Sequence, residues 1–197
     1  MNYLAHAYLS FNEPGIITGN MISDFVKGKK KFNYSDIIQK GIILHRAIDE
    51  FTDAHTVTKE AKLFFKPDYR LYSGAFVDVV YDHFLATDEN EFTEQTLKNF
   101  SLHTYQLLES DKKFLPENFA HIFYYMQKDN WLFNYRFKQS IYKSFGGLVR
   151  RASYMYEHQT AYNIFEKNYD ELKNCYQNFF PTLKSFAFEK LHQLLLQ

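Results

Sequence analysis

Carboxylate and imidazole side chains recur at helical spacing inside stretches that are otherwise apolar. His45 and Asp49 are four residues apart among isoleucine, leucine and phenylalanine, and Asp78 and Asp82 repeat that spacing in a second apolar stretch. Residues four apart lie on the same face of an α-helix. An imidazole and a carboxylate on one face can bind the same cation, whereas two buried carboxylates repel and need a compensating partner.

A divalent metal ion is one partner that suits these residue types. Oxygen and imidazole donors together are typical ligands of Mn²⁺, Fe²⁺, Zn²⁺ or Mg²⁺, and the single cysteine, Cys175, cannot build a structural zinc site. Arg46 can neutralise one of the acids but not all of them. The residues that together predict a metal site are Asp24, His45, Asp49, Asp78, Asp82 and His83.

Each of these residues, taken alone, also has a structural explanation. A lone histidine such as His6 is more often a hydrogen-bonded core residue than a ligand, and Asp24 can form an ion pair with a nearby cation. Asp53 and His55 fall at a predicted helix end, where one can be solvated and the other can cap the helix. Because ion-pair networks also perturb acids, the pattern alone leaves a metal site and a structural network open.

Long helices are predicted to position these residues. Seven glycines and four prolines are few for 197 residues, and alternation with a period of two is too rare for a sheet. Ser35 can cap a helix that continues to about Asp53. Pro67 and Pro116 are expected to open helices, and Pro181 to kink or divide the last one. Further helices are expected over residues 68–86, 93–108, 145–156 and 162–179. The sequence therefore predicts one all-α domain over residues 1–197, with roughly seven to nine helices.

Composition and charge restrict the class of protein further. Phenylalanine, tyrosine and tryptophan number 21, 16 and 1, which excludes intrinsic disorder. Basic and acidic residues number 23 each, so the chain lacks the basic excess of a general nucleic-acid binder. No apolar run approaches the roughly 18 residues of a membrane span, no signal peptide is evident, and a single cysteine fits a reducing compartment. We therefore expect a cytoplasmic protein that binds neither nucleic acid nor membrane.

The sequence resembles the acyl carrier protein phosphodiesterases, also called ACP hydrolases. The resemblance covers nearly the whole chain, and its most specific parts are residues 44–55 and the pair Asp82-His83. The other matching segments are residues 1–6, 19–20, 24–28, 41–42, 78–85, 131–132, 135, 150–151 and 179–181. The resemblance implies a helix bundle related to the metal-dependent HD-domain phosphohydrolases. Those proteins have His before Asp in the dyad, so their ligand assignments do not transfer by position.

The resemblance implies a metal-dependent phosphodiesterase of lipid and fatty acid metabolism. Such an enzyme hydrolyses the link between 4′-phosphopantetheine and a serine of holo-acyl carrier protein, and releases apo-acyl carrier protein and 4′-phosphopantetheine. Manganese is the implied cofactor, with Mg²⁺, Fe²⁺ and Zn²⁺ as alternatives. Two other functions stay open: a helical phosphohydrolase of nucleotides or other small phosphoesters, and a non-catalytic metal-binding or interaction protein.

This resemblance also suggests roles for individual residues. Those expected to be metal ligands or their close neighbours are Asp24, His45, Asp49 and Asp82. Those expected to be ligands, proton-transfer groups or phosphate contacts are His6, His83 and Arg46. Those expected to orient ligands are Asp78, Asp53 and His55. Those expected to contact the acidic carrier protein are Arg150, Arg151, Lys29, Lys30 and Lys31.

Overall fold

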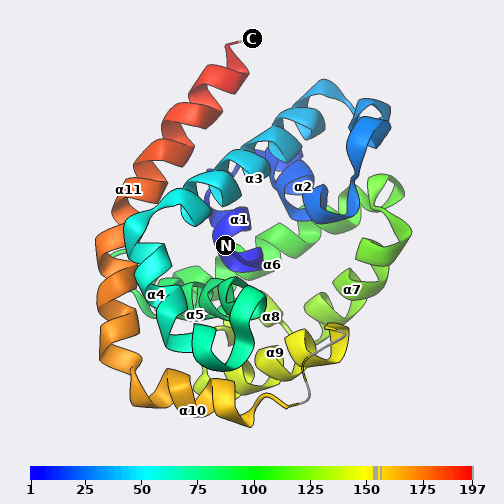
Figure 1. The fold of residues 1–197 in the computed structure, drawn as a ribbon. Coiled ribbons are helices and arrows are strands. Elements are labelled where there is room, and N and C mark those ends of the chain that lie inside the picture. The colour runs from blue at the N-terminus through cyan, green and yellow to red at the C-terminus, as the bar shows by residue number, and fades with distance from the viewer. Residues whose placement is uncertain (153–154, 156, 197) are drawn as a thin grey trace.

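A computed structural model describes residues 1–152, 155 and 157–196, and shows helices with no strand among those residues (Figure 1). The α-helices are α1 (Tyr3–Tyr8), α2 (Pro14–Ile22), α3 (Asp36–Ala54), α4 (Thr56–Tyr69), α5 (Ser73–Thr87), α6 (Glu94–Ser110), α7 (Glu117–Lys128), α8 (Trp131–Asn134), α9 (Lys138–Arg151), α10 (Gln159–Lys167) and α11 (Tyr169–Leu195). Short 3₁₀ helices are η1 (Ser23–Phe25), η2 (Gly28–Asn33), η3 (Arg70–Tyr72) and η4 (Lys112–Phe114). The all-α prediction is confirmed, although the described residues form more helices than predicted.

One predicted helix start is wrong. Pro67 was expected to open a helix over 68–86, but it lies in the last turn of α4, and α5 begins only at Ser73. The break is at Arg70, whose φ of 47° lies in the left-handed region and ends α4. Pro67 has no backbone N–H, so α4 lacks one intrahelical hydrogen bond there, and the helix ends two residues later.

The other boundaries follow the sequence more closely, except that the single helix expected over 162–179 is divided at Asn168 between α10 and α11. Ser35 immediately precedes α3, although its side chain makes no capping hydrogen bond, and Pro116 immediately precedes α7. Pro181 lies inside α11, which is not divided there. The helix expected over 145–156 is the second half of α9, which ends at Arg151; residues 153, 154 and 156 lie outside the described residues.

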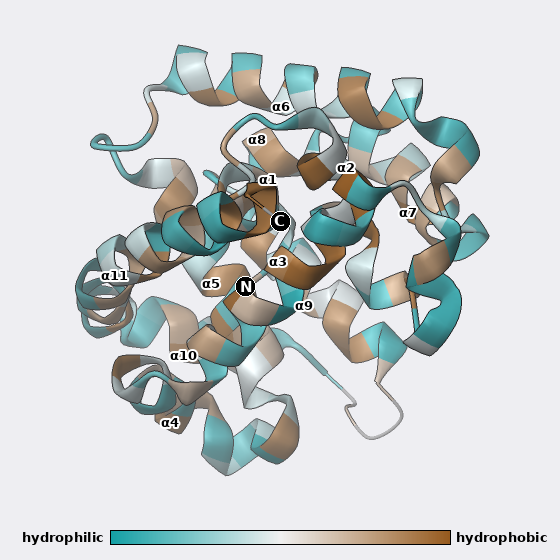
Figure 2. Cartoon of the chain, turned by 90° about the horizontal axis from the view of Figure 1, so that it is seen from above, coloured by the Kyte–Doolittle hydropathy of each residue, from teal (hydrophilic) through white to brown (hydrophobic). Residues whose placement is uncertain are grey.

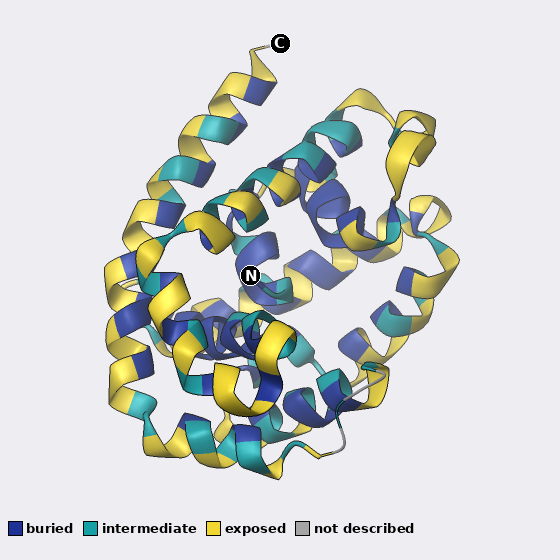
Figure 3. Ribbon diagram, in the orientation of Figure 1, coloured by how far each residue is buried: buried dark blue, intermediate teal, exposed yellow. Residues whose placement is uncertain are grey.

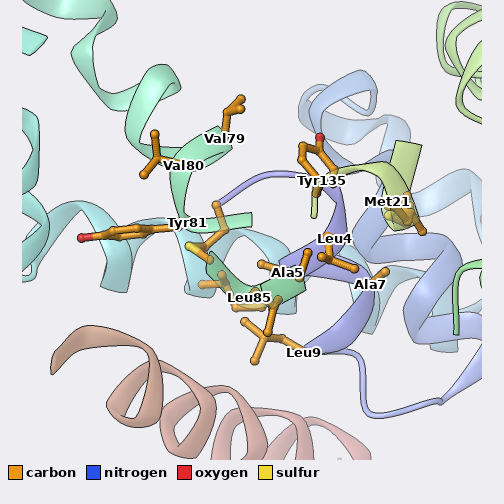
Figure 4. Packing of buried hydrophobic residues seen from close by; sticks show 14 of the residues in the cluster. Leu4, Ala5, Ala7, Leu9, Met21, Val79, Val80, Tyr81, Leu85 and Tyr135 are labelled. Atoms are coloured by element: carbon orange, nitrogen blue, oxygen red, sulfur yellow. The ribbon is translucent and has the colours of Figure 1, made fainter. Parts of the chain in front are cut away.

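Helix α5 runs through the middle of the molecule and is buried on nearly all sides (Figure 3). Its burial is what an almost uniformly apolar helix requires. The short α1 packs against it, with Leu4, Ala5 and Leu9 close to Leu85 (Figure 4). Each of these leucines is fully buried and contributes about 2–3 kcal/mol to folding. This packing holds the N-terminal segment in the interior.

Helices α2 and α3 cross in backbone contact at two glycines. A Cβ atom on Gly19 would lie 2.1 Å from the carbonyl oxygen of Ile38 and 2.9 Å from the Cα atom of Gly41. Because only glycine fits there, the residues that follow Gly19 in α2 lie directly against α3.

The outer helices bury one face each. Polar and apolar residues alternate along α4, α6 and α11 in Figure 2, as expected for helices that pack on a core with one side. None of the helices in the described part of the chain is long and apolar enough to cross a membrane.

Candidate metal centre

Three side chains from two helices converge inside the N-terminal half of the molecule. His6 of α1 contributes Nε2, which lies 3.2 Å from Asp49 Oδ1 of α3. His45, one turn before Asp49 on α3, places its Nε2 3.1 Å from Asp49 Oδ2. Each residue offers a potential ligand atom within 4.8 Å of the other two. We call these three residues the His/Asp cluster.

The orientation of His45 is set by Asn20 of α2. The Nδ1 atom of His45 lies 2.8 Å from the Asn20 carbonyl oxygen and 3.2 Å from its Oδ1. These acceptors favour a proton on Nδ1 and leave Nε2 facing Asp49. The Asn20 amide also donates to the carbonyl oxygen of His6 at 2.9 Å and to Ser10 Oγ at 3.0 Å. Asn20 thereby joins α1, α2 and α3 around the cluster.

Sequence reasoning did not assign a role to Asn20. Its side chain is completely buried, and a buried amide must find hydrogen-bond partners. The only available signal was its position directly after Gly19 in an apolar helix, inside a segment that matches the family pattern.

Asp24 of η1 lies at the open side of the cluster. Its Oδ1 is 3.2 Å from His45 Nε2, and its side chain is 70% exposed. Together with Tyr3, His6, Asn20 and His45, it lines a small cavity beside the cluster. The structure therefore brings Asp24, His45 and Asp49 together as predicted ligand candidates, and adds His6 to them.

The charges in the cluster are strongly coupled. Burial alone would lower the pKa of His45, but the carboxylates of Asp24 and Asp49 outweigh it and raise the pKa to about 9. Burial alone would raise the pKa of Asp49, but His45 and His6 hold it well below its usual range. Burial, followed by repulsion from His45, lowers the pKa of His6 to about 4. Without an ion, the cluster therefore contains one imidazolium, one neutral imidazole and a carboxylate.

The donor set fits a divalent metal ion. Both ring nitrogens of His6 are buried and, among the residues that the structure describes, neither has a partner in hydrogen-bonding geometry. Such unsatisfied nitrogens are rare in protein interiors, and a metal ion bound to Nε2, the nitrogen that faces Asp49, would give one of the two a partner. Two donor atoms bound to one ion lie up to about 4.4 Å apart when the metal–ligand bonds are about 2.0–2.2 Å long. The candidate ligand atoms of the cluster are similarly spaced, since all of them lie within 4.8 Å of one another. Binding an ion would displace the proton of His45.

Asp82 lies elsewhere, at the N-terminus of α1. Its Oδ2 accepts a hydrogen bond from the backbone N–H of Leu4 at 2.7 Å, and its Oδ1 accepts one from Ala5 at 3.2 Å. The partners that the structure gives Asp82 are therefore the N–H groups at the end of a helix, and its predicted role as a metal ligand stays a prediction. Burial raises the pKa of Asp82 to about 7, although these N–H groups oppose the rise.

Asp78 also has a partner other than a metal. Its Oδ1 lies 3.1 Å from the amino group of Met1, which in turn lies 3.4 Å from Asp49 Oδ1. Asp78 is thus linked to Asp49 through the amino group of Met1, and its predicted role in orienting a ligand stays a prediction. Burial raises the pKa of Asp78, and the amino group opposes that rise.

His83 and Arg46 do not reach the cluster. His83 follows Asp82 on α5 but points to another side of the helix, because successive residues are about 100° apart. Its Nδ1 lies 2.7 Å from the carbonyl oxygen of Tyr135, and its Nε2 lies 2.9 Å from the hydroxyl of Tyr169. The Arg46 guanidinium donates to the Val26 carbonyl at 3.0 Å and so holds η1 against α3.

Two further candidates have local structural partners. Asp53 forms an exposed ion pair with Lys62, with 2.6 Å between Oδ1 and Nζ. His55 lies between α3 and α4, against the rings of Phe51 and Phe179.

The predicted docking residues lie on two sides of the site. Arg150 and Arg151 occupy the last turn of α9, and Arg151 is near enough to Tyr3 for its charge to oppose the rise that burial causes in the pKa of the Tyr3 hydroxyl. Because Tyr3 lines the cavity of the cluster, Arg151 is close to the opening. The lysines Lys29, Lys30 and Lys31 are exposed on η2.

Comparisons with known proteins agree on one family. The family model described as acyl carrier protein phosphodiesterase matches residues 1–183. The acyl carrier protein phosphodiesterase of Yersinia pestis is 30% identical over 191 residues, which cover 96% of this chain and 99% of the relative. Those of Yersinia enterocolitica and Photorhabdus laumondii are 29% and 27% identical over 96% of this chain, and over 99% and 96% of their own lengths. No solved structure matches the chain, so kinship with HD-domain proteins stays a prediction.

Proposed function

This chain belongs to the acyl carrier protein phosphodiesterase family of enzymes, and on that premise we propose that it hydrolyses the diester between 4′-phosphopantetheine and a serine of holo-acyl carrier protein. The products are apo-acyl carrier protein and 4′-phosphopantetheine, and the reaction depends on a divalent metal, Mn²⁺ in our proposal. The His/Asp cluster carries this proposal, because its donors match a divalent ion and lie beside a cavity. We assign the reaction to the cytoplasm.

The ion would be held by His6, His45 and Asp49. When bound, a divalent metal supplies a Lewis acid that withdraws charge from phosphoryl oxygens and lowers the pKa of a coordinated water. A phosphodiester needs both effects, since its anion repels nucleophiles and its alkoxide leaves poorly.

The chain itself prepares the site in two ways. The Asn20 carbonyl holds the Nδ1 proton of His45, so that the Nε2 lone pair faces the centre. Before an ion binds, the protonated His45 donates a hydrogen bond to Asp24 and lowers the pKa of its carboxyl group, so Asp24 is ionised. As its side chain is mostly exposed at the cavity mouth, we assign Asp24 to accepting a proton from the attacking water.

The carrier protein would dock through positive charge around this mouth. We propose Arg150 and Arg151 as the main contacts, because Arg151 lies beside Tyr3 at the cavity. Lys29, Lys30 and Lys31 on η2 offer a second basic surface on the side of Asp24. Complementary charge of this kind raises association rates and selects an acidic partner.

Mass spectrometry of purified holo-acyl carrier protein, incubated with this protein and Mn²⁺, tests the proposal directly. We expect the carrier protein to lose the mass of the prosthetic group, and the Asp49→Asn variant to leave it intact. An unchanged carrier mass, with a wild-type protein that has been shown to bind Mn²⁺, would contradict the proposal. Hydrolysis of nucleotides in a parallel assay would then favour the alternative phosphohydrolase.

A further inference from the structure

A second hollow adjoins the His/Asp cluster at Asp24. One wall of this groove comes from the segment with Phe25, Lys27 and Lys30, and the other comes from Pro116, Glu117 and Asn118 at the start of α7. Asp24 lines both the groove and the cavity of the cluster, so the two spaces meet at this side chain. A substrate whose reacting group lies at the cluster can therefore extend into the groove.

The size of the groove favours a slender occupant. Its volume is about 560 Å³, within the roughly 300–1,000 Å³ of small-ligand sites. An α-helix with side chains is about 10 Å wide and would fill this volume within about 7 Å, fewer than five residues. The groove therefore fits a thin chain and not a docked protein helix.

The lining favours an uncharged occupant. The charges of Lys27 and Lys30 are formally balanced by Asp24 and Glu117. The remaining lining side chains are an aromatic ring, a proline and the amide of Asn118, which together suit a chain of methylene and amide groups. The ring of Phe25 is held in place by packing against the buried Phe119, with 5.4 Å between the two ring centroids.

We infer that this groove binds the uncharged pantetheine arm of the substrate, while the phosphodiester lies at the cluster. The inference rests on the proposed function and adds the location of the arm. It assigns arm recognition to Phe25 and Asn118, and it leaves the basic residues at the rim for the carrier protein.

Calorimetric titration with pantetheine, which lacks the phosphate, tests the groove separately from catalysis. We expect wild-type protein to bind pantetheine and the Asn118→Trp variant to bind it at least about tenfold more weakly, a loss of about 1.4 kcal/mol. Gln127→Trp is the matched control, since Gln127 is exposed on the same helix and does not line the groove. Its affinity for pantetheine should equal that of wild type.

Pantetheine is neutral, so its affinity should not change between low and high ionic strength. Failure of wild type to bind pantetheine, or equal binding by Asn118→Trp, would overturn the inference even if the carrier protein is hydrolysed. The opposite result is also informative. If wild type binds pantetheine and Asn118→Trp does not, but wild type fails to release the prosthetic group from holo-carrier protein, the groove assignment stands and the proposed reaction is contradicted.

Discussion

The imidazole rings of His6 and His45 stack, with centroids 3.8 Å apart and 15° between their planes. The two residues come from different helices, and their contact depends on packing at both. Asp82 anchors the first turn of α1 that carries His6, and the glycine crossing presses α2 and its Asn20 against His45. The His/Asp cluster is therefore a product of the core, and core substitutions should affect it.

Replacing Asp49 with asparagine should weaken metal binding strongly. The change deletes the anionic donor between the two imidazoles, so we expect the affinity for Mn²⁺ to fall by more than about tenfold, and turnover to fall with it. Titration followed by the electron paramagnetic resonance of free Mn²⁺ measures this directly. Asp36→Asn is the control, because Asp36 lies on the same helix in an exposed ion pair with Lys40. Wild-type affinity in Asp49→Asn would show that the cluster is not the metal site.

Replacing Asp82 with alanine should destabilise the fold more than it weakens metal binding. Two buried N–H groups lose their acceptor, which costs about 2–4 kcal/mol in the free energy of unfolding. Urea denaturation measures the loss, and Asp82→Asn should lose less because one acceptor oxygen remains. If Asp82→Ala instead keeps its stability and loses Mn²⁺ affinity, Asp82 is a ligand and not a cap.

Adding a methyl group at Gly19 should disturb both the fold and the site. The Cβ atom of Gly19→Ala would overlap the carbonyl oxygen of Ile38, so α2 must move away from α3 and take Asn20 with it. We expect a loss of stability of about 2 kcal/mol or more, together with weaker Mn²⁺ binding. Gly74→Ala is the control, since its Cβ atom meets only the flexible end of Lys62. Equal melting temperatures for the two variants would contradict the close crossing.

His83 should make stability depend on pH between about 6.5 and 4. Burial lowers the pKa of His83 to about 4 in the native state, whereas the unfolded value is about 6.5. Between these values the unfolded chain binds a proton that the native state does not, so stability is lost as the pH falls through this window. The contribution is at most about 3 kcal/mol at pH 4.

Denaturation of wild type and His83→Gln at several pH values isolates this contribution. The variant is expected to be less stable at pH 7, because it loses part of the contacts to Tyr135 and Tyr169. Its stability should decline less steeply with acid. Parallel profiles for both proteins would mean that His83 titrates normally.

Reversing the charge of Arg151 should weaken the carrier protein complex in a salt-dependent manner. We expect Arg151→Glu to raise the KM for holo-acyl carrier protein about tenfold at low ionic strength, with the difference shrinking at high salt. Lys173→Glu, an exposed change on α11, is the control. A KM of Arg151→Glu that equals wild type at every salt concentration would remove Arg151 from the docking surface.

Local rules applied to the sequence were enough to predict the helical class and the pairing of His45 with Asp49 on one helix face. Both follow from local rules, because the scarcity of glycine and proline permits long helices and the 3.6-residue period places residues four apart on one face. The interruption at Arg70 was not predictable in this way, because nothing local distinguishes a residue that tertiary packing places at a positive φ.

Packing between distant segments selects the other acids and histidines that join that pair. His6 reaches the cluster because α1 is packed on α5, a contact between segments far apart in the sequence. Asp82, like Asp49, is an aspartate in an apolar stretch of the sequence. Its carboxylate nevertheless accepts hydrogen bonds from the N–H groups at the end of a helix. A buried carboxylate needs a positive partner, and a sequence does not show whether that partner is a metal, an ammonium group or a helix terminus.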